Sequence, residues 1–173
     1  MTIMSSHQYG HEHVPGRVIA VLNGPSLNLL GEREPALYGS ATLADVEGLC
    51  RDTAAGLGFT VDFRQTNHEG ELVDQVHELR GQAAGFVVNA AAYSHTSLAL
   101  RDALATVTAP VVDVHLTNIH ARESYRQRSF VSHVASAVIA GCGPHGYELA
   151  IRHLAARVGH HDLEERADEP AFT

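Results

Sequence analysis

The sequence predicts an α/β fold, a three-layer sandwich in which helices cover both faces of a five-stranded parallel sheet. Apolar stretches of strand length alternate along the chain with longer stretches of helical periodicity. Three of the strands, V-I-A-V-L, G-F-V-V and P-V-V-D-V, are almost wholly apolar, which is typical of strands buried on both faces. Right-handed crossovers between such strands favour the flavodoxin-like strand order 2-1-3-4-5.

The first half of the chain supplies two strands and two helices. Residues 17–22 form the first apolar strand, and the helical pattern over 43–57 follows Thr42 and Ser40, either of which is suited to cap it. Residues 60–64 predict the second strand. A helix over 69–80 follows it, with Asn67 as the expected cap.

The second half of the chain repeats the alternation three times. An apolar strand over 85–89 precedes a helix over 96–106, and a strand over 110–115 precedes a short helix over 122–128. A last strand over 137–141 leads to a helix over 146–158. One catalytic domain over 17–158 is therefore expected, between a polar, His-rich, disordered tail over 1–16 and an acidic, fraying tail over 159–173.

Composition excludes several classes of function. The formal net charge is −8 and no basic stripe is evident, which argues against nucleic acid and anionic membranes as partners. All 12 basic residues are arginine, so Schiff-base catalysis is confined to the N-terminal amine and a Walker-type phosphate loop is excluded. Cys50 and Cys142 are expected to be reduced and buried. No signal peptide or apolar run of spanning length is evident, which predicts a cytoplasmic location.

Polar residues stand where three of the predicted strands end. Asn23, Asn89 and His115 each directly follow or close an apolar stretch. Ligands of open α/β sheets bind beyond the carboxyl ends of the strands. Two amides and an imidazole at that edge predict a site for a small polar molecule.

The connection after the first strand is far longer than most strand-to-helix loops. It runs from Asn23 to about residue 41 and holds Arg33 and Tyr38 between two glycines, as a lid over the crevice would. A guanidinium beside a phenol favours the phenolate, so Tyr38 is a candidate base. His115 is the matching candidate acid, with Asp113 on the same strand face to orient its ring.

Further polar groups are expected around the same crevice. The segment N-A-A-A-Y-S-H-T-S brings His95 beside it, and backbone N–H groups at Leu116 and Thr117 are suited to hold a carboxylate. Arg126 is expected to reach substrate hydroxyls, and Arg122 to form a structural ion pair. No metal ion and no organic cofactor are expected.

Four successive motifs resemble the signatures of the type II 3-dehydroquinate dehydratases (type II dehydroquinases). They are N-G-P-S-L-N-L-L-G-E-R-E-P-A-L-Y-G, N-H-E-G-E-L, N-A-A-A-Y-S-H-T-S and V-D-V-H-L-T-N-I-H-A-R-E-S-Y-R. The resemblance covers about residues 17–158, nearly the whole predicted domain. Several motifs in the right order are far more specific than one alone.

The resemblance implies a lyase of the shikimate pathway, in aromatic amino acid and chorismate biosynthesis, or of quinate catabolism. The reaction would be the reversible dehydration of 3-dehydroquinate to 3-dehydroshikimate through an enolate. Tyr38 would be the base, Arg33 would lower its pKa and stabilise the transition state, and His115 would protonate the leaving hydroxyl. The implied substrate-binding residues are Asn89, His95, Leu116, Thr117, Arg126 and, reaching into a neighbouring subunit of a dodecamer built from trimers, Asp102.

Three positions depart from the family pattern. The usual N-G-P-N-L-N has Ser26 at its fourth position, which implies a gap that water fills. The usual Glu two residues before the histidine is Asp113, whose shorter side chain predicts a longer or water-bridged hydrogen bond to His115. Thr117 replaces a serine conservatively.

Two other functions are compatible with the sequence. One is a non-catalytic paralogue that binds a quinate-like ligand or serves as an assembly module, which Ser26 and Asp113 would explain. The other is a hydrolase that uses Ser94 or Ser97 with His95, although the G-x-S-x-G elbow of such enzymes is absent.

Overall fold

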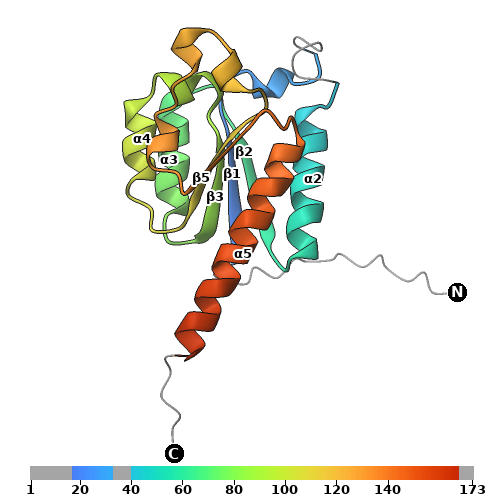
Figure 1. The fold of residues 1–173 in the computed structure, drawn as a ribbon, viewed down its shortest axis with the longest axis vertical. Helices are drawn as coiled ribbons and strands as arrows, with labels where there is room; N and C mark the ends of the chain where they lie inside the picture. Colours follow the sequence, from blue (N-terminus) through green and yellow to red (C-terminus); the bar gives the residue numbers. More distant parts are fainter. Residues whose placement is uncertain (1–16, 33–39, 168–173) are drawn as a thin grey trace, which may run out of the picture.

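The computed structural model describes residues 17–32 and 40–167. Its sheet consists of β1 (Val18–Asn23), β2 (Thr60–Gln65), β3 (Ala83–Asn89), β4 (Val111–His115) and β5 (Ala137–Ala140). All neighbouring strands are parallel, and their order is β2-β1-β3-β4-β5 (Figure 1). The predicted fold class and strand order are confirmed.

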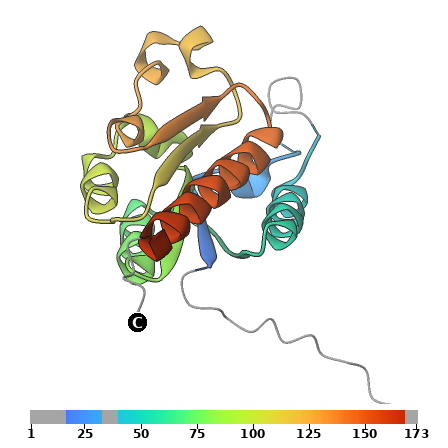
Figure 2. The same ribbon diagram turned by 60° about the horizontal axis from the view of Figure 1, so that its bottom comes forward.

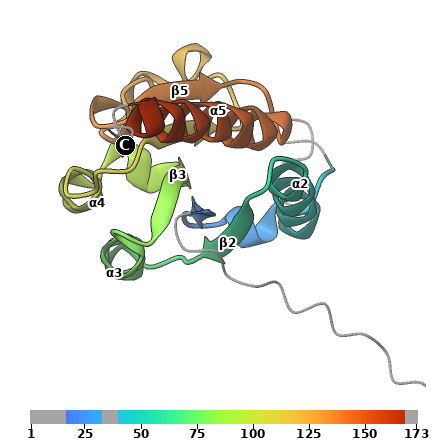
Figure 3. The same ribbon diagram turned by 90° about the horizontal axis from the view of Figure 1, so that it is seen from below.

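Helices cover both faces of this sheet. The helices α2 (Leu43–Gly56) and α5 (His145–Ala167) pack on one face, and α3 (Glu69–Leu79) and α4 (Leu98–Leu104) pack on the other (Figure 3). Figure 2 shows α5 in front of the sheet, with nearly the same slant as the neighbouring strands near the C-terminal end of the chain. Each face has its own apolar cluster, with Tyr147, Ile151 and Leu154 of α5 in one and Leu72, Val76 and Leu100 of α3 and α4 in the other. No helix in the described ranges is long and apolar enough to cross a membrane.

The two predicted helix caps of the first half have different outcomes. Thr42 caps α2 through a capping box, in which its side chain accepts from the Asp45 backbone N–H and the Asp45 carboxylate accepts from the Thr42 backbone N–H. The prediction of Asn67 as the cap of α3 is wrong, because His68 occupies that position and makes no side-chain cap bond. The Asn67 amide oxygen instead accepts hydrogen bonds from the Ser26 backbone and the Gln65 side chain.

Several predicted helices have other limits in the structure. The helix expected over 96–106 is shorter, since Ser97 caps α4 and a 3₁₀ turn, η2 (Ala91–His95), precedes it. The helix expected over 122–128 is absent, and only a short 3₁₀ turn, η4 (Ser124–Arg126), lies in that range, after a first 3₁₀ turn, η3 (Ile119–Ala121). The last helix continues to Ala167, past its predicted end at residue 158. Cys50 is buried as expected, whereas Cys142 is exposed.

Candidate active site

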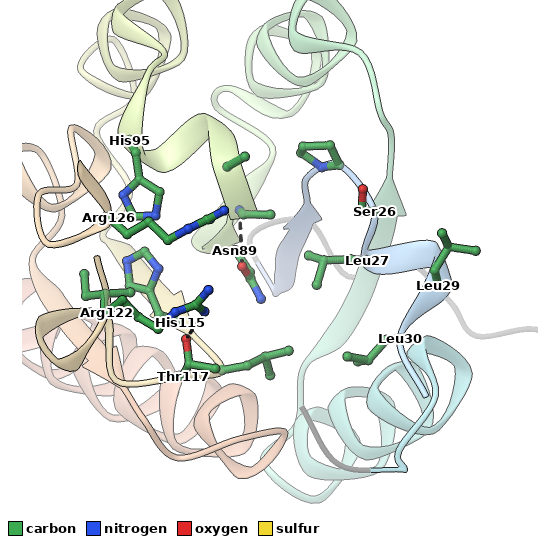
Figure 4. Close-up of a pocket in the computed structure, with 15 residues that line it drawn as sticks. Ser26, Leu27, Leu29, Leu30, Asn89, His95, His115, Thr117, Arg122 and Arg126 are labelled. Atoms are coloured by element: carbon green, nitrogen blue, oxygen red, sulfur yellow. Dashed lines mark hydrogen bonds between the residues drawn. The ribbon is translucent and has the colours of Figure 1, made fainter. Parts of the chain in front are cut away.

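One pocket lies beyond the carboxyl ends of β1, β3 and β4, at the predicted edge of the sheet (Figure 4). The 3₁₀ turn η1 (Leu27–Leu29) and its flanking residues form one wall. The ends of β3 and β4 and the turns that follow them form the opposite wall. Predicted site residues that line this pocket are Asn89, His95, His115, Leu116, Thr117 and Arg126.

The other predicted site residues are not among the described residues that line this pocket. Arg33 and Tyr38 lie outside the described residues. Asp102 is on α4, where its exposed carboxylate pairs with Arg101 at 2.8 Å. Asn23 is wholly buried and also does not line the pocket, so the expectation that it flanks the crevice is wrong.

His115 is held by a buried carboxylate. Its Nε2 lies 3.0 Å from Oδ2 of Asp113, whose side chain is fully buried. The aspartate therefore reaches the ring directly, and the expectation of a water-bridged contact is wrong. Because a carboxylate only accepts, Nε2 carries the hydrogen and Nδ1 is the ring nitrogen left for a proton transfer in the pocket.

Two serines complete the environment of this carboxylate. The hydroxyls of Ser129 and Ser132 donate to the same Oδ2 of Asp113, at 2.8 and 2.6 Å. Oδ1 of Asp113 has no hydrogen-bond partner among the described residues. Three donors on one oxygen offset much of the desolvation penalty of a buried charge. No local sequence pattern points to these serines, because they lie 16 and 19 residues beyond Asp113 in an irregular segment.

His95 stands beside His115 with a fixed ring orientation. Its Nδ1 donates to the backbone carbonyl of Arg128 at 2.8 Å, and the two imidazole rings stack with centroids 6.1 Å apart. Burial, and to a lesser degree the nearby His115 and Arg126, lower the pKa of His95. Neutral His95 with its hydrogen on Nδ1 presents the lone pair of Nε2, which accepts a hydrogen bond from a ligand hydroxyl.

Two guanidinium groups border the pocket. Arg122 and Arg126 share the carboxylate of Glu123, with nitrogen–oxygen distances of 3.3 and 3.4 Å. Arg122 also lies 3.4 Å from the hydroxyl of Thr117. The expected ion pair of Arg122 is therefore present, and this residue lines the pocket as well. The pocket thus offers positive charge suited to an anionic ligand.

Backbone strain is concentrated at the pocket. Ser26 and Ala91 have φ values of 65° and 50°, in the left-handed region that ordinary side chains avoid, and both line the pocket. Between these two walls, the backbone N–H of Gly24 donates to the carbonyl of Asn89 at 2.8 Å. A Cβ on Gly24 would lie 2.2 Å from the carbonyl oxygen of Ala90, so only glycine fits there.

The serine-hydrolase alternative is not supported by the geometry. Ser94 is fully buried and its hydroxyl has no hydrogen-bond partner among the described residues. Ser97 accepts from the backbone of Leu100 as the cap of α4. His95, the expected base, is directed to a backbone carbonyl and to neither serine.

Comparison with protein families identifies one match over most of the chain. A family model described as "Dehydroquinase class II" matches residues 17–155. A curated 3-dehydroquinate dehydratase from Methylobacterium radiotolerans is 59% identical over 137 residues, which cover 79% of this chain and 92% of that protein. One from Streptomyces avermitilis is 60% identical over 139 residues, covering 80% of this chain and 87% of that protein.

Solved structures agree with this match. The crystal structure of a type II dehydroquinase from Propionibacterium acnes superposes with a TM-score of 0.76 at 41% sequence identity. The match covers 81% of this chain and 97% of that chain. A second type II dehydroquinase structure, from Butyrivibrio crossotus, has a TM-score of 0.77 at 37% identity, over 79% of this chain and 96% of that chain.

Proposed function

This chain belongs to the class II dehydroquinase family, and on that premise we propose that it is a hydro-lyase that converts 3-dehydroquinate reversibly to 3-dehydroshikimate. The structural observation that carries the proposal is the contact between His115 and the buried Asp113 at the wall of the pocket. It gives an imidazole of fixed orientation at the edge of the sheet where a ligand is expected.

The reaction uses one proton transfer at carbon and one at oxygen. Tyr38, made more acidic by Arg33, removes the proton next to the ketone and yields an enolate. His115 in its cationic form donates the Nδ1 proton to the departing hydroxyl, which leaves as water. Collapse of the enolate to the conjugated enone supplies the electron pair that breaks this carbon–oxygen bond, in the same step as the departure of water.

The rest of the pocket holds the substrate. Asn89 and Arg126 are suited to its hydroxyls, and His95 accepts from a hydroxyl through Nε2. The backbone at Leu116 and Thr117, next to positive charge, is suited to its carboxylate. Each of these groups is an organic side chain or a backbone amide, and the proposal assigns no metal ion or cofactor to the reaction.

A homo-oligomer forms part of the proposal. Asp102 is exposed on α4 and is not among the described residues that line the pocket of its own copy, which agrees with a role in the site of a neighbouring copy. We propose a dodecamer built from trimers, located in the cytoplasm. Light scattering on the purified protein tests the assembly. A monomer with full activity would contradict the role of Asp102.

A spectrophotometric assay tests the function. Purified protein given 3-dehydroquinate, without added metal or reductant, is expected to produce the absorbance of the conjugated enone. Tyr38→Phe and Arg33→Ala are each expected to lower kcat by roughly 10²-fold or more, since each removes a group that acts in the proton-transfer step. Full turnover in either variant would refute its assigned role.

The non-catalytic alternative has a distinct outcome in the same assay. A binding or assembly paralogue would bind the substrate tightly and show no turnover between about pH 6 and 9, a range that brackets an imidazole and an acidified phenol. The high identity to proteins named as dehydratases favours the enzyme over this alternative.

A further inference from the structure

A line of buried hydrogen bonds runs from the end of β2 to the pocket. The side-chain amide of Asn23 donates to the backbone carbonyl of Arg64 at 3.0 Å. The hydroxyl of Tyr147 donates to Oδ1 of Asn23 at 2.6 Å and accepts from Nδ2 of Asn89 at 2.8 Å. The three side chains Asn23, Asn89 and Tyr147 are each at most 3% exposed. Of these, Asn89 lines the pocket.

The backbone carbonyl of Arg64, at the start of this line, determines which group donates and which accepts in every later hydrogen bond. A backbone carbonyl only accepts, so Nδ2 of Asn23 must face Arg64 and Oδ1 must face Tyr147. The single hydroxyl hydrogen of Tyr147 is then used on Asn23, and its oxygen must accept from Asn89. Burial raises the pKa of Tyr147 far above the ordinary range for a phenol, so the group stays a neutral donor.

A separate hydrogen bond, made by Oδ1 of Asn89, supports the same orientation of its amide. Its Oδ1 accepts from the backbone N–H of Ala91 at 3.3 Å, and a backbone N–H only donates. Each atom of the amide thus keeps one free position, a second hydrogen on Nδ2 and a second lone pair on Oδ1. Without Tyr147, the long bond to Ala91 alone would hold this orientation.

We propose that Tyr147 is a positioning residue that fixes which end of the Asn89 amide is presented to the substrate in the pocket. Tyr147 touches no ligand itself and acts through Asn89. The proposal rests on the proposed dehydratase function for its kinetic test, and on the geometry alone for its spectroscopic test.

The kinetic test is a double-mutant cycle on the full chain. Tyr147→Phe is expected to lower kcat/KM for 3-dehydroquinate about tenfold, chiefly through KM, because a misdirected amide loses a binding contact. In an Asn89→Ala background the same substitution should change kcat/KM by less than about twofold, since no amide remains to orient. An equal loss in both backgrounds would show a merely structural role and overturn the proposal.

Two further variants keep the test decisive if Tyr147→Phe is unstable. Asn23→Ala leaves the phenol in place but removes the acceptor of its hydrogen, so the hydroxyl is free to donate as well as to accept and no longer fixes the orientation of the Asn89 amide. The same loss of kcat/KM is expected from this variant, although Asn23 does not line the pocket. Tyr93→Phe is the matched control, because it removes a phenol hydroxyl whose one hydrogen-bond partner among the described residues is the backbone carbonyl of Asn67. Its kcat/KM should equal that of the wild type.

A spectroscopic measurement separates this proposal from the proposed function. In protein labelled with ¹⁵N-asparagine, one side-chain Nδ2 hydrogen of Asn89 should be protected from exchange, and Tyr147→Phe should abolish that protection. If the wild type shows no turnover but the protection is lost as expected, the dehydratase function fails and the positioning role stands. If the wild type turns over and Tyr147→Phe changes neither protection nor KM, the positioning role fails.

Discussion

Gly24 offers the sharpest test of how the pocket is assembled. A Cβ at this position would lie 2.2 Å from the oxygen and 2.5 Å from the carbon of the Ala90 carbonyl, both backbone atoms that cannot rotate away. Gly24→Ala therefore requires β1 and β3 to separate by about 1 Å at their carboxyl ends, given ordinary carbon–oxygen contacts of about 3.3 Å or more. The 2.8 Å hydrogen bond from Gly24 to Asn89 would be lost with this movement.

The magnitude follows from those two effects. Overpacking costs about 1–3 kcal/mol and the lost hydrogen bond about 1 kcal/mol, so the free energy of unfolding should fall by about 2–4 kcal/mol. For a chain of this size that lowers Tm by roughly 5–15 °C. A displacement of about 1 Å at Asn89 should also lower kcat/KM by up to roughly 10²-fold.

The matched control is Gly48→Ala in the exposed middle of α2. A Cβ there meets no atom within 4 Å, so the same substitution should raise the free energy of unfolding by about 0.5–1 kcal/mol through helix propensity. Thermal unfolding measures Tm, and the enone assay measures kcat/KM, for both variants. Wild-type Tm and kcat/KM in Gly24→Ala would refute the close approach of β1 to Ala90.

Three other substitutions test the remaining features of the site. Ser26→Asn should raise the free energy of unfolding by about 0.5–1 kcal/mol, since asparagine tolerates a φ of 65° better than serine; an unchanged urea midpoint would contradict this. Asp113→Asn should lower kcat by roughly 10²-fold, because an uncharged amide no longer stabilises the cationic form of His115, and wild-type kcat would contradict that role. His95, with its lowered pKa, stays neutral in the folded protein while the unfolded chain takes up a proton below about pH 6.5, so stability falls on acidification from there. In His95→Gln the free energy of unfolding should therefore change less with pH below about 6.5 than in the wild type, whereas the control His77→Gln, at an exposed position, should behave like the wild type. If the free energy of unfolding has the same pH dependence in both variants, His95 does not contribute to it.

The fold and the location of the site could be predicted from the sequence because both depend on local patterns. Continuous apolar runs identify buried parallel strands, and a polar residue at the end of such a run must lie at the ligand-binding edge. Asn89 and His115 were found in this way. Asn23 has the same pattern, but its side chain turns into the interior to meet Tyr147, and no local signal distinguishes the two orientations.

The features that could not be predicted depend on contacts between distant segments. Asn67 has the composition of a helix cap, yet tertiary hydrogen bonds to Ser26 and Gln65 take its side chain away from that role. The partners of Asp113 are serines in an irregular segment, where periodicity gives no information. Arg126 reaches the pocket as predicted, but on the short 3₁₀ turn η4 and not on a helix. Arg122 was expected only to form an ion pair, yet it follows η3 directly and also lines the pocket.

The left-handed backbone at Ser26 and Ala91 has a consequence for any attempt to increase the thermostability of this protein. In the described chain these are the places where a non-glycine residue has a positive φ, and each lines the pocket. Relieving either one would release stored free energy, but it would also reshape the surface that receives the ligand. Thermostability and the shape of the binding surface are therefore coupled at these two positions, and a substitution selected for one will also change the other.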